Sequence, residues 1–298
     1  MALSTLHAPA PQWLSRVRFV LVGTSHPGNV GAAARAMRVM GLRELVLVAP
    51  RSERVARHPE AVARASGALD VLENAVVADS LAQALAPCSL AVAVSADTRE
   101  FGPAPQPPEE IAALAFAEAS ADASARVAFV FGAERNGLSI EAVGQCQRVC
   151  SIPGGTDYAS LNLAQAVQIV AYCLRAHERL HSPAPPAASA SPAASASPAA
   201  SASPAASAPH FASHEQIEAL HAHLERALVR IGFLDPRHPK KLMPRLRRLF
   251  SRTRLEVEEV ELLRGVCTQI EKACTNPYAP PGRDGSYSPV PPNEGDSE

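Results

Sequence analysis

Short apolar runs separated by turn-forming residues recur through the first half of the chain. Their length and their content of valine, leucine and phenylalanine are typical of strands buried on both faces of a sheet. Six such runs are expected to be strands: 17–22, 44–48, 75–77, 89–94, 127–131 and 148–152. Segments with helical character lie between them, so the pattern predicts an α/β domain with a parallel sheet. Four prolines within 103–108 are expected to break the chain before a helix at 109–120.

A glycine-rich loop, 23–31, joins the first strand to a helix. The loop has the glycine spacing of a P-loop, but Asn29 and Val30 stand where that motif requires lysine and serine or threonine. A dinucleotide fingerprint fits no better, because residues 49–51 lack the acidic side chain that binds ribose. What remains is a helix start suited to an anion, with Arg35 two turns further along.

Small residues surround Arg35 on this helix and would let another backbone approach it closely. They are Gly31, Ala32, Ala33, Ala34 and Ala36. Arg35 itself is either an ordinary solvated arginine or a contact for a phosphate or another substrate group. The pattern around it leaves both interpretations open.

A second polar cluster is predicted at the ends of two later strands. Gly132 and Glu134 follow the strand at 127–131, while Ser160 and Asn162 open a helix after the last strand. Ligands of open α/β sheets bind at the carboxyl ends of strands, so these residues are expected to converge on one crevice. The alternative is structural: Glu134 would pair with a nearby arginine, and the two later residues would cap a helix.

Three segments resemble the motifs of SPOUT-class RNA 2'-O-ribose methyltransferases. They are Asn29-Val30-Gly31 with Arg35, then 131–138, then 160–164, in the order of that family and at strand–helix junctions. The similarity covers about 17–180. Within the class, the chain most resembles bacterial tRNA (cytidine/uridine-2'-O)-methyltransferases, which add a small helical domain. Ala159 departs from the pattern, since relatives often carry a small polar residue there.

The resemblance implies a SPOUT fold with a carboxyl-terminal trefoil knot, an obligate homodimer formed through this domain, and S-adenosylmethionine as cofactor. It implies a cytoplasmic enzyme that methylates tRNA, with cytidine or uridine at position 32 of the anticodon loop as the expected target. The cofactor residues carried over are Val94, Ser95, Ala96, Gly132, Ile152, Ala159, Ser160 and Leu161.

The catalytic residues that the resemblance implies are Arg35, Glu134, Ser160 and Asn162. The family assigns its motif-one arginine to activation of the hydroxyl, but a guanidinium with a pKa above about 12 is a poor base. We therefore expect Arg35 to clamp a substrate phosphate and stabilise the developing alkoxide. Glu134 and Asn162 would orient Arg35 or the ribose, and Ser160 would support the motif-three loop.

The carboxyl-terminal part separates into a linker, a helical module and a tail. Residues 182–209 contain three copies of Ser-Pro-Ala-Ala-Ser-Ala, a composition that cannot bury a core and predicts a mobile tether. The expected organisation is a disordered segment at 1–15, a methyltransferase domain at 16–181, this linker, a helical tRNA-binding domain at 210–275, and a disordered tail at 276–298.

Three amphipathic helices are expected in the module, near 213–231, 244–251 and 255–273. The first begins with a capping box at Ser213 and carries an apolar stripe that includes Ile231. The histidines of the module are interpreted as surface residues. They are His210, His214, His221 and His223.

Basic residues gather in 226–254, whereas the third helix is acidic. The two charged segments could pair with each other, or the basic one could grip an RNA backbone, which the resemblance favours. The RNA-binding candidates are Asn29, Arg35, Lys240, Lys241, Arg245, Arg247 and Arg248.

The sequence as a whole argues against a metal site, a signal peptide and a membrane-spanning segment. The formal net charge is −1, and six cysteines without a CxxC pair indicate free buried thiols and predict no metal site. We see neither a signal peptide nor an apolar run long enough to span a membrane. The alternatives that stay open are a catalytically silent knotted RNA-binding protein and a methyltransferase acting on rRNA or another tRNA site. A dinucleotide-dependent oxidoreductase is disfavoured by Ala49 and Pro50.

Overall fold

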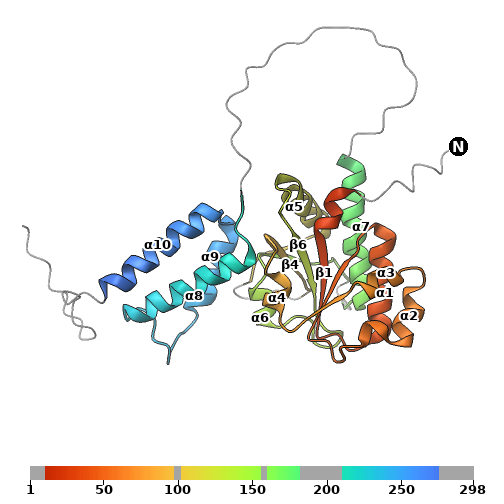
Figure 1. Cartoon of the computed structure of the whole chain (residues 1–298), viewed down its shortest axis with the longest axis horizontal. Helices are drawn as coiled ribbons and strands as arrows, with labels where there is room; N and C mark the ends of the chain where they lie inside the picture. The colour runs from red at the N-terminus through yellow and green to blue at the C-terminus, as the bar shows by residue number, and fades with distance from the viewer. Residues whose placement is uncertain (1–10, 97–101, 156–159, 182–209, 275–298) are drawn as a thin grey trace, which may run out of the picture.

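A parallel sheet in the order β3-β2-β1-β6-β4-β7-β5 forms the centre of the larger domain (Figure 1). The computed structural model describes residues 11–96, 102–155, 160–181 and 210–274. Within them the strands are β1 (Val17–Val22), β2 (Glu44–Val48), β3 (Val76–Ala78), β4 (Leu90–Val94), β5 (Pro105–Gln106), β6 (Val127–Phe131) and β7 (Arg148–Cys150). The predicted α/β fold class and its six strands are therefore confirmed, while the trefoil knot stays a prediction.

The strand β5 was not predicted, and its sequence explains why. It is two residues long and begins at Pro105, which has no amide hydrogen to donate to a ladder. An edge position tolerates such a residue, and the Gln106 carbonyl accepts a hydrogen bond of 2.9 Å from the amide of Ser151. The proline-rich segment thus contributes the sheet's edge.

The strand β7 ends two residues before the predicted position.

Helices cover both faces of the sheet (Figure 1). One face packs against α1 (Pro27–Met40), α2 (Pro59–Ala65), α3 (Leu69–Glu73), α5 (Pro108–Ala121) and α7 (Leu163–His181). The other face packs against α4 (Leu81–Leu85) and α6 (Ile140–Gly144). Side chains alternate accordingly: Phe19 and Leu21 of β1 enter the first core, and Val20 enters the second.

The amino-terminal edge is more ordered than expected. Residues Gln12–Arg16 form the 3-10 helix η2, and a second one, η3, spans Val55–Arg57. Trp13 is buried, its indole Nε1 donates to Glu178 over 2.7 Å, and its ring meets Phe116 edge to face. Residues 12–15 are thus part of the domain, whereas 1–10, the predicted linker 182–209 and the predicted tail from 276 lie outside the described residues.

The small residues of α1 do admit another backbone, and it is the backbone of α2. A Cβ atom built on Gly31 would stand 2.1 Å from the carbonyl oxygen of Ala61, which is far inside van der Waals contact. Gly31 is buried in the face where α1 meets α2. This glycine therefore sets the distance between the two helices.

The carboxyl-terminal module consists of α8 (His214–Arg230), α9 (Leu242–Thr253) and α10 (Val257–Ala273). The predicted capping box is confirmed, with the Ser213 hydroxyl accepting from the Gln216 amide and the Gln216 side chain accepting from the Ser213 amide. Leu220, Val260 and Cys267 are buried in its interior. Ile231 was wrongly assigned to the apolar stripe, because its side chain is 47% exposed beyond the end of α8.

The prediction that the module's histidines lie on the surface is wrong for three of the four. His214, His221 and His223 are buried, and only His210 is exposed. His214 and His221 lie on the helix face of Ile217, because these positions are three and four residues apart. The His221 ring packs 6.0 Å from the ring of Phe250. The helical spacing of His214 and His221 relative to Ile217 indicates burial, whereas the polar character of histidine led to the opposite prediction.

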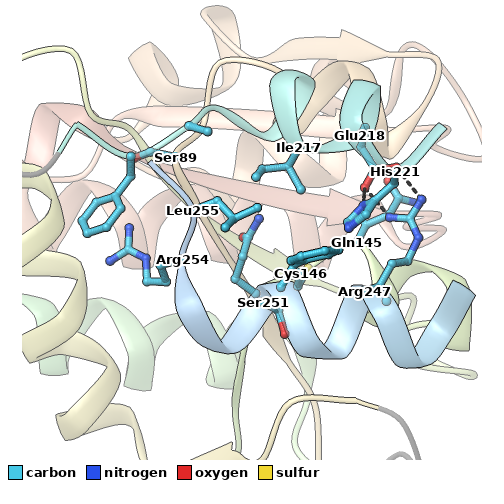
Figure 2. A pocket seen from close by; sticks show the side chains of 15 residues that line it. Ser89, Gln145, Cys146, Ile217, Glu218, His221, Arg247, Ser251, Arg254 and Leu255 are labelled. Atoms are coloured by element: carbon cyan, nitrogen blue, oxygen red, sulfur yellow. Dashed lines mark hydrogen bonds and ion pairs between the residues drawn. The ribbon is translucent and has the colours of Figure 1, made fainter. Parts of the chain in front are cut away.

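The module packs against the α4 and α6 side of the sheet domain (Figure 1). The His214 amide donates to the carbonyl of Cys88 over 2.7 Å, and the Arg148 guanidinium donates to the carbonyl of Ser251 over 2.8 Å. Figure 2 shows the pocket at this junction, lined by residues of both units. The module is therefore docked on the domain.

Substitution of Gly31 by alanine is expected to destabilise the fold by about 1–3 kcal/mol or more, because a backbone carbonyl cannot move aside as a side chain can. Gly265, inside α10, is the matched control: nothing lies within 4 Å of a Cβ built there. Gly265→Ala should stabilise α10 by about 0.5–1 kcal/mol through its higher helix propensity. Urea unfolding of both variants measures the difference, and equal effects of the two changes would contradict this view of Gly31.

Candidate active site

The carboxylate of Glu134 is the centre of a hydrogen-bonded cluster between two loops. Glu134 lies in the loop after β6, which neighbours β1 in the sheet. It accepts hydrogen bonds from the side chains of Thr24 (3.2 Å), Ser25 (3.2 Å) and Asn29 (3.0 Å). The backbone amides of Ser25 and His26 also donate to it, each over 3.2 Å. One carboxylate thus organises the whole β1–α1 loop.

These hydrogen bonds keep Glu134 ionised. Burial by itself would raise the pKa of the carboxyl, but donation from Asn29, from its own backbone and from the amides of Ser25 and His26 lowers that pKa to about 2. The anion predicted at the start of α1 is therefore supplied by the chain itself. The structural alternative, in which Glu134 pairs with a neighbouring arginine, is not the arrangement found.

Asn29 extends the cluster to the third motif. Its Oδ1 accepts a hydrogen bond of 3.0 Å from Nδ2 of Asn162, while its own Nδ2 donates a hydrogen bond to Glu134. The other end of the Asn162 amide accepts from the backbone of Ala164 over 2.9 Å and so caps α7. Asn29 therefore joins two segments that each lie more than a hundred residues further along the chain.

Arg35 lies beside this cluster on the exposed surface of α1. It lines one groove together with Leu161, Asn162 and Arg64. The other lining residues come from α1 and α7: Ala32, Ala36, Val39, Ala164, Gln165, Gln168 and Ile169. Within the part of the chain that the structure describes, Arg35 has no hydrogen bond or ion pair, so its guanidinium is available to a substrate.

Two groups of groove residues escaped the sequence reasoning. Gln165 and Gln168 lie one turn apart on α7 and follow Leu161 at helical spacing, a signal that could have been used. Arg64 lies on α2, and nothing in the sequence links this residue to the motifs. It reaches the groove because Gly31 lets α2 approach α1.

The predicted cofactor residues lie at the carboxyl ends of three neighbouring strands. Val94 aligns with Phe131 of β6 and with Cys150 of β7, and the Ser95 amide donates to the Cys150 carbonyl over 3.0 Å. Ala96, Gly132 and Ile152 follow these strand ends directly. Ser160 and Leu161 are exposed before α7, while Ala159 lies outside the described residues. The sheet order thus brings the first five of these residues to one edge.

Gly132 has a local structural role. A Cβ atom at this position would stand 2.1 Å from the carbonyl carbon of Gly137, since Ala133 and Gly137 form an antiparallel bridge. Gly137 has a φ of +61°, the left-handed conformation that glycine adopts readily. The two glycines therefore fold the loop back on itself, and this turn presents Glu134 to the β1–α1 loop.

The basic candidates of the module lie elsewhere and do not all face outward. Lys240, Lys241 and Arg245 are exposed at and near the start of α9. Arg247 forms an ion pair with Glu218 of α8, including a contact of 2.7 Å between Nη2 and Oε2. Arg248 is half-buried. The predicted RNA-binding set is thus divided between α1 and α9, which lie on opposite faces of the sheet (Figure 1). On α1, Arg35 lines the groove, whereas Asn29 is held in the Glu134 network.

The cysteines are unreactive in character, because most of them are buried thiols. All six cysteines are free thiols and five are buried, as predicted; burial raises the pKa of Cys88, Cys146 and Cys150 to about 12. The described ranges contain no cluster of three or more potential metal ligands. In the same ranges, no helix has the length and apolarity needed to cross a membrane.

Two family models match this chain. Residues 16–172 match the SpoU rRNA Methylase family, and residues 215–279 match the C-terminal domain of the tRNA methyltransferase TrmJ. The first match covers more than half of the chain and includes all three motifs.

Named relatives are similar over nearly their whole length. The tRNA (cytidine/uridine/adenosine-2'-O-)-methyltransferase TrmJ of Pseudomonas aeruginosa is 42% identical over 259 residues, covering 87% of this chain and 95% of the relative. The tRNA (cytidine/uridine-2'-O-)-methyltransferase TrmJ of Yersinia enterocolitica is 40% identical over 275 residues, covering 92% and 97%.

Two solved structures of methyltransferases are also similar to this chain. TrmJ from Z. mobilis is 29% identical with a TM-score of 0.68, covering 89% of this chain and 100% of that chain. A probable methyltransferase from Bordetella pertussis is 51% identical with a TM-score of 0.53, covering 56% and 98%. The motif resemblance is thereby confirmed, and the chain belongs to the SpoU methylase family, with a TrmJ-type C-terminal domain.

Proposed function

We propose that this protein transfers a methyl group from S-adenosylmethionine to a ribose 2'-hydroxyl of tRNA. The observation that carries the proposal is the Glu134–Asn29–Asn162 network, which joins the three motifs beside the available guanidinium of Arg35. The relatives' printed activities support the same reaction and the tRNA substrate. Position 32 of the anticodon loop, as cytidine or uridine, is the target we expect.

The residues at the ends of β4, β6 and β7 suit the cofactor's chemistry. Val94 and Ile152 offer partly buried apolar surface, and backbone groups of the strand ends can hydrogen-bond adenine and ribose. Leu161, which is 41% exposed, adds a further apolar group near the Arg35 groove. When bound there, S-adenosylmethionine supplies an electrophilic methyl group on a sulfonium.

Arg35 is the residue we assign to the substrate. Its positive charge can bind the phosphate next to the reacting ribose and stabilise negative charge as it develops on the 2'-oxygen. Asn162, whose amide is fixed at both ends, holds the motif-three loop at the same groove. Positioning of this kind can contribute several kcal/mol to lowering a barrier.

Glu134 is assigned a positioning role and not that of a base. A carboxylate with a pKa near 2 binds protons too weakly to accept one from a hydroxyl at neutral pH. Its hydrogen bonds hold Asn29 and the β1–α1 loop, so its effect on Arg35 is exerted through α1. This refines the expectation that Glu134 orients Arg35 or the ribose directly.

We propose a cytoplasmic homodimer formed through the methyltransferase domain. Val39 of α1 and Tyr172 of α7 are large apolar side chains that are 67% and 59% exposed, and a second copy would cover them. An rRNA substrate is the second candidate, because the matching family model is described by rRNA methylation. The C-terminal domain and the relatives' names favour tRNA.

Deletion of the gene is expected to abolish one 2'-O-methylation at position 32 of tRNA and to leave rRNA methylation unchanged. The wild-type gene should restore it, and Arg35→Ala should restore at most about 1% of the rate, the loss typical of a removed charge-stabilising donor. Methylation mapping on both RNA classes provides the measurement. Arg38→Ala is the control, because Arg38 is on the same helix but pairs with Asp70 over 2.9 Å. Unchanged tRNA methylation in the deletion strain would refute the proposed function.

Glu134→Gln is expected to lower stability at pH 7 by about 1–2 kcal/mol, after allowing for solvent screening of this partly exposed group. The carboxyl has a lower pKa in the folded protein, about 2 against 4.5, so its contribution is present above pH 4.5 and is lost as the pH falls toward 2. Urea unfolding at pH 7 and pH 3 should therefore show a difference between variant and wild type that shrinks at the lower pH. The exposed Glu141→Gln serves as control. A difference that is independent of pH would be inconsistent with the network.

A further inference from the structure

Arg254 joins the helical module to the methyltransferase domain. It follows the last residue of α9, and its guanidinium forms an ion pair with the carboxylate of Glu118 on α5. The two side chains are 15% and 1% exposed, so both charges are withdrawn from water. The Arg254 guanidinium also stacks over the ring of Phe211, with Cζ 3.9 Å from the ring centroid.

This ion pair is poorly suited to stabilising the fold. Glu118 Oε1 has no hydrogen-bond partner within the described part of the chain, and Arg254 adopts a φ of +55°, a conformation that costs free energy in a residue other than glycine. Buried pairs often contribute little net stability, yet a docking position that separated the two side chains and still covered either of them would leave a buried charge without its partner. The pair therefore defines where the module can dock.

A second contact fixes the same end of α9. Arg148 of β7 donates a hydrogen bond of 2.8 Å to the carbonyl of Ser251, in the last turn of the helix. Such carbonyls have no partner within the helix, and they attract positive charge. Burial and the neighbouring Arg254 lower the pKa of the Arg148 guanidinium. Glu118, Arg148, Ser251 and Arg254 together form what we call the interdomain latch.

Figure 2 shows two of the latch residues, Arg254 and Ser251, and how they lie relative to α9. Arg254 and Ser251 lie toward one end of the helix and Arg247 toward the other, where it contacts Glu218. The contacts described hold the helix at its carboxyl-terminal end and along its inner side. Lys240, Lys241 and Arg245 remain exposed near the opposite end. The latch thus holds an exposed basic segment at a fixed position relative to the sheet.

We infer that Glu118 and Arg254 are positioning residues for tRNA methylation, because they hold the basic segment of α9 in register with the Arg35 groove on the other face of the sheet. This inference rests on the proposed function. A tRNA that contacts both places binds a surface already assembled, so less ordering is required on binding. Glu118 cannot contact RNA itself, because it is negatively charged and buried.

The test uses the full-length protein with Glu118→Gln, Arg254→Met and the double variant. Each is expected to raise KM for tRNA about tenfold by loss of the preassembled surface, with kcat and KM for S-adenosylmethionine unchanged. The double variant should match the single ones, because either change opens the latch. Arg43→Met is the matched control: it also removes one positive charge, from the more exposed Arg43–Asp70 pair, and should leave KM unchanged.

Other outcomes would overturn the inference. If Arg254 contacted a phosphate directly, Glu118→Gln would leave KM unchanged or lower it, and the effects of the two changes would be additive. Should a latch variant fail to fold, as judged by thermal unfolding and cofactor binding, Arg148→Met provides a second route and must show the same KM increase. Failure of the proposed function would appear differently, as a wild-type enzyme that does not methylate tRNA.

Discussion

The ionised carboxylate of Glu134 is the constraint on which the site depends. Backbone amides at the start of a helix favour an anion, and this chain supplies the anion from a loop more than a hundred residues away. That contact is possible because β6 lies beside β1 in the sheet, so that the loops following the two strands are neighbours. Asn29, which donates a hydrogen bond to Glu134, accepts another from Asn162 and so links this cluster to the start of α7. A half-buried carboxylate surrounded by fixed hydrogen-bond donors thus holds together the loops that the sheet topology brings side by side.

The two faces of the sheet carry different parts of the proposed tRNA-binding surface. The face with α1, α2 and α7 carries the Arg35 groove, and the face with α4 and α6 carries the helical module. A substrate that contacts both must extend around the domain, as a folded RNA can and a short oligonucleotide cannot. In this view the proposed reaction requires both local order around Asn29 and a fixed relation between the faces, which the interdomain latch provides.

Sequence patterns predicted those features that depend on local spacing. Strands such as Val127–Phe131, the Ser213 capping box and the identity of the three motifs follow from runs, caps and short-range order. The partners of charged and polar side chains could not be predicted in this way. Glu134 with Ser25, Arg247 with Glu218, and Arg254 with Glu118 are tertiary pairs whose members are 29 to 136 residues apart. The buried histidines were missed because residue type was weighed above helix-face position.

The most direct test of this account is a double-mutant cycle across the Asn29–Asn162 hydrogen bond. Asn29→Ala removes the link, and Asn162→Ser breaks the same link while keeping a residue that can cap α7. The account predicts that each change lowers kcat/KM for methyl transfer to tRNA and that the double variant is little worse, with a coupling energy of about 1–2 kcal/mol. Strictly additive effects would contradict it, because the motifs would then act independently of each other.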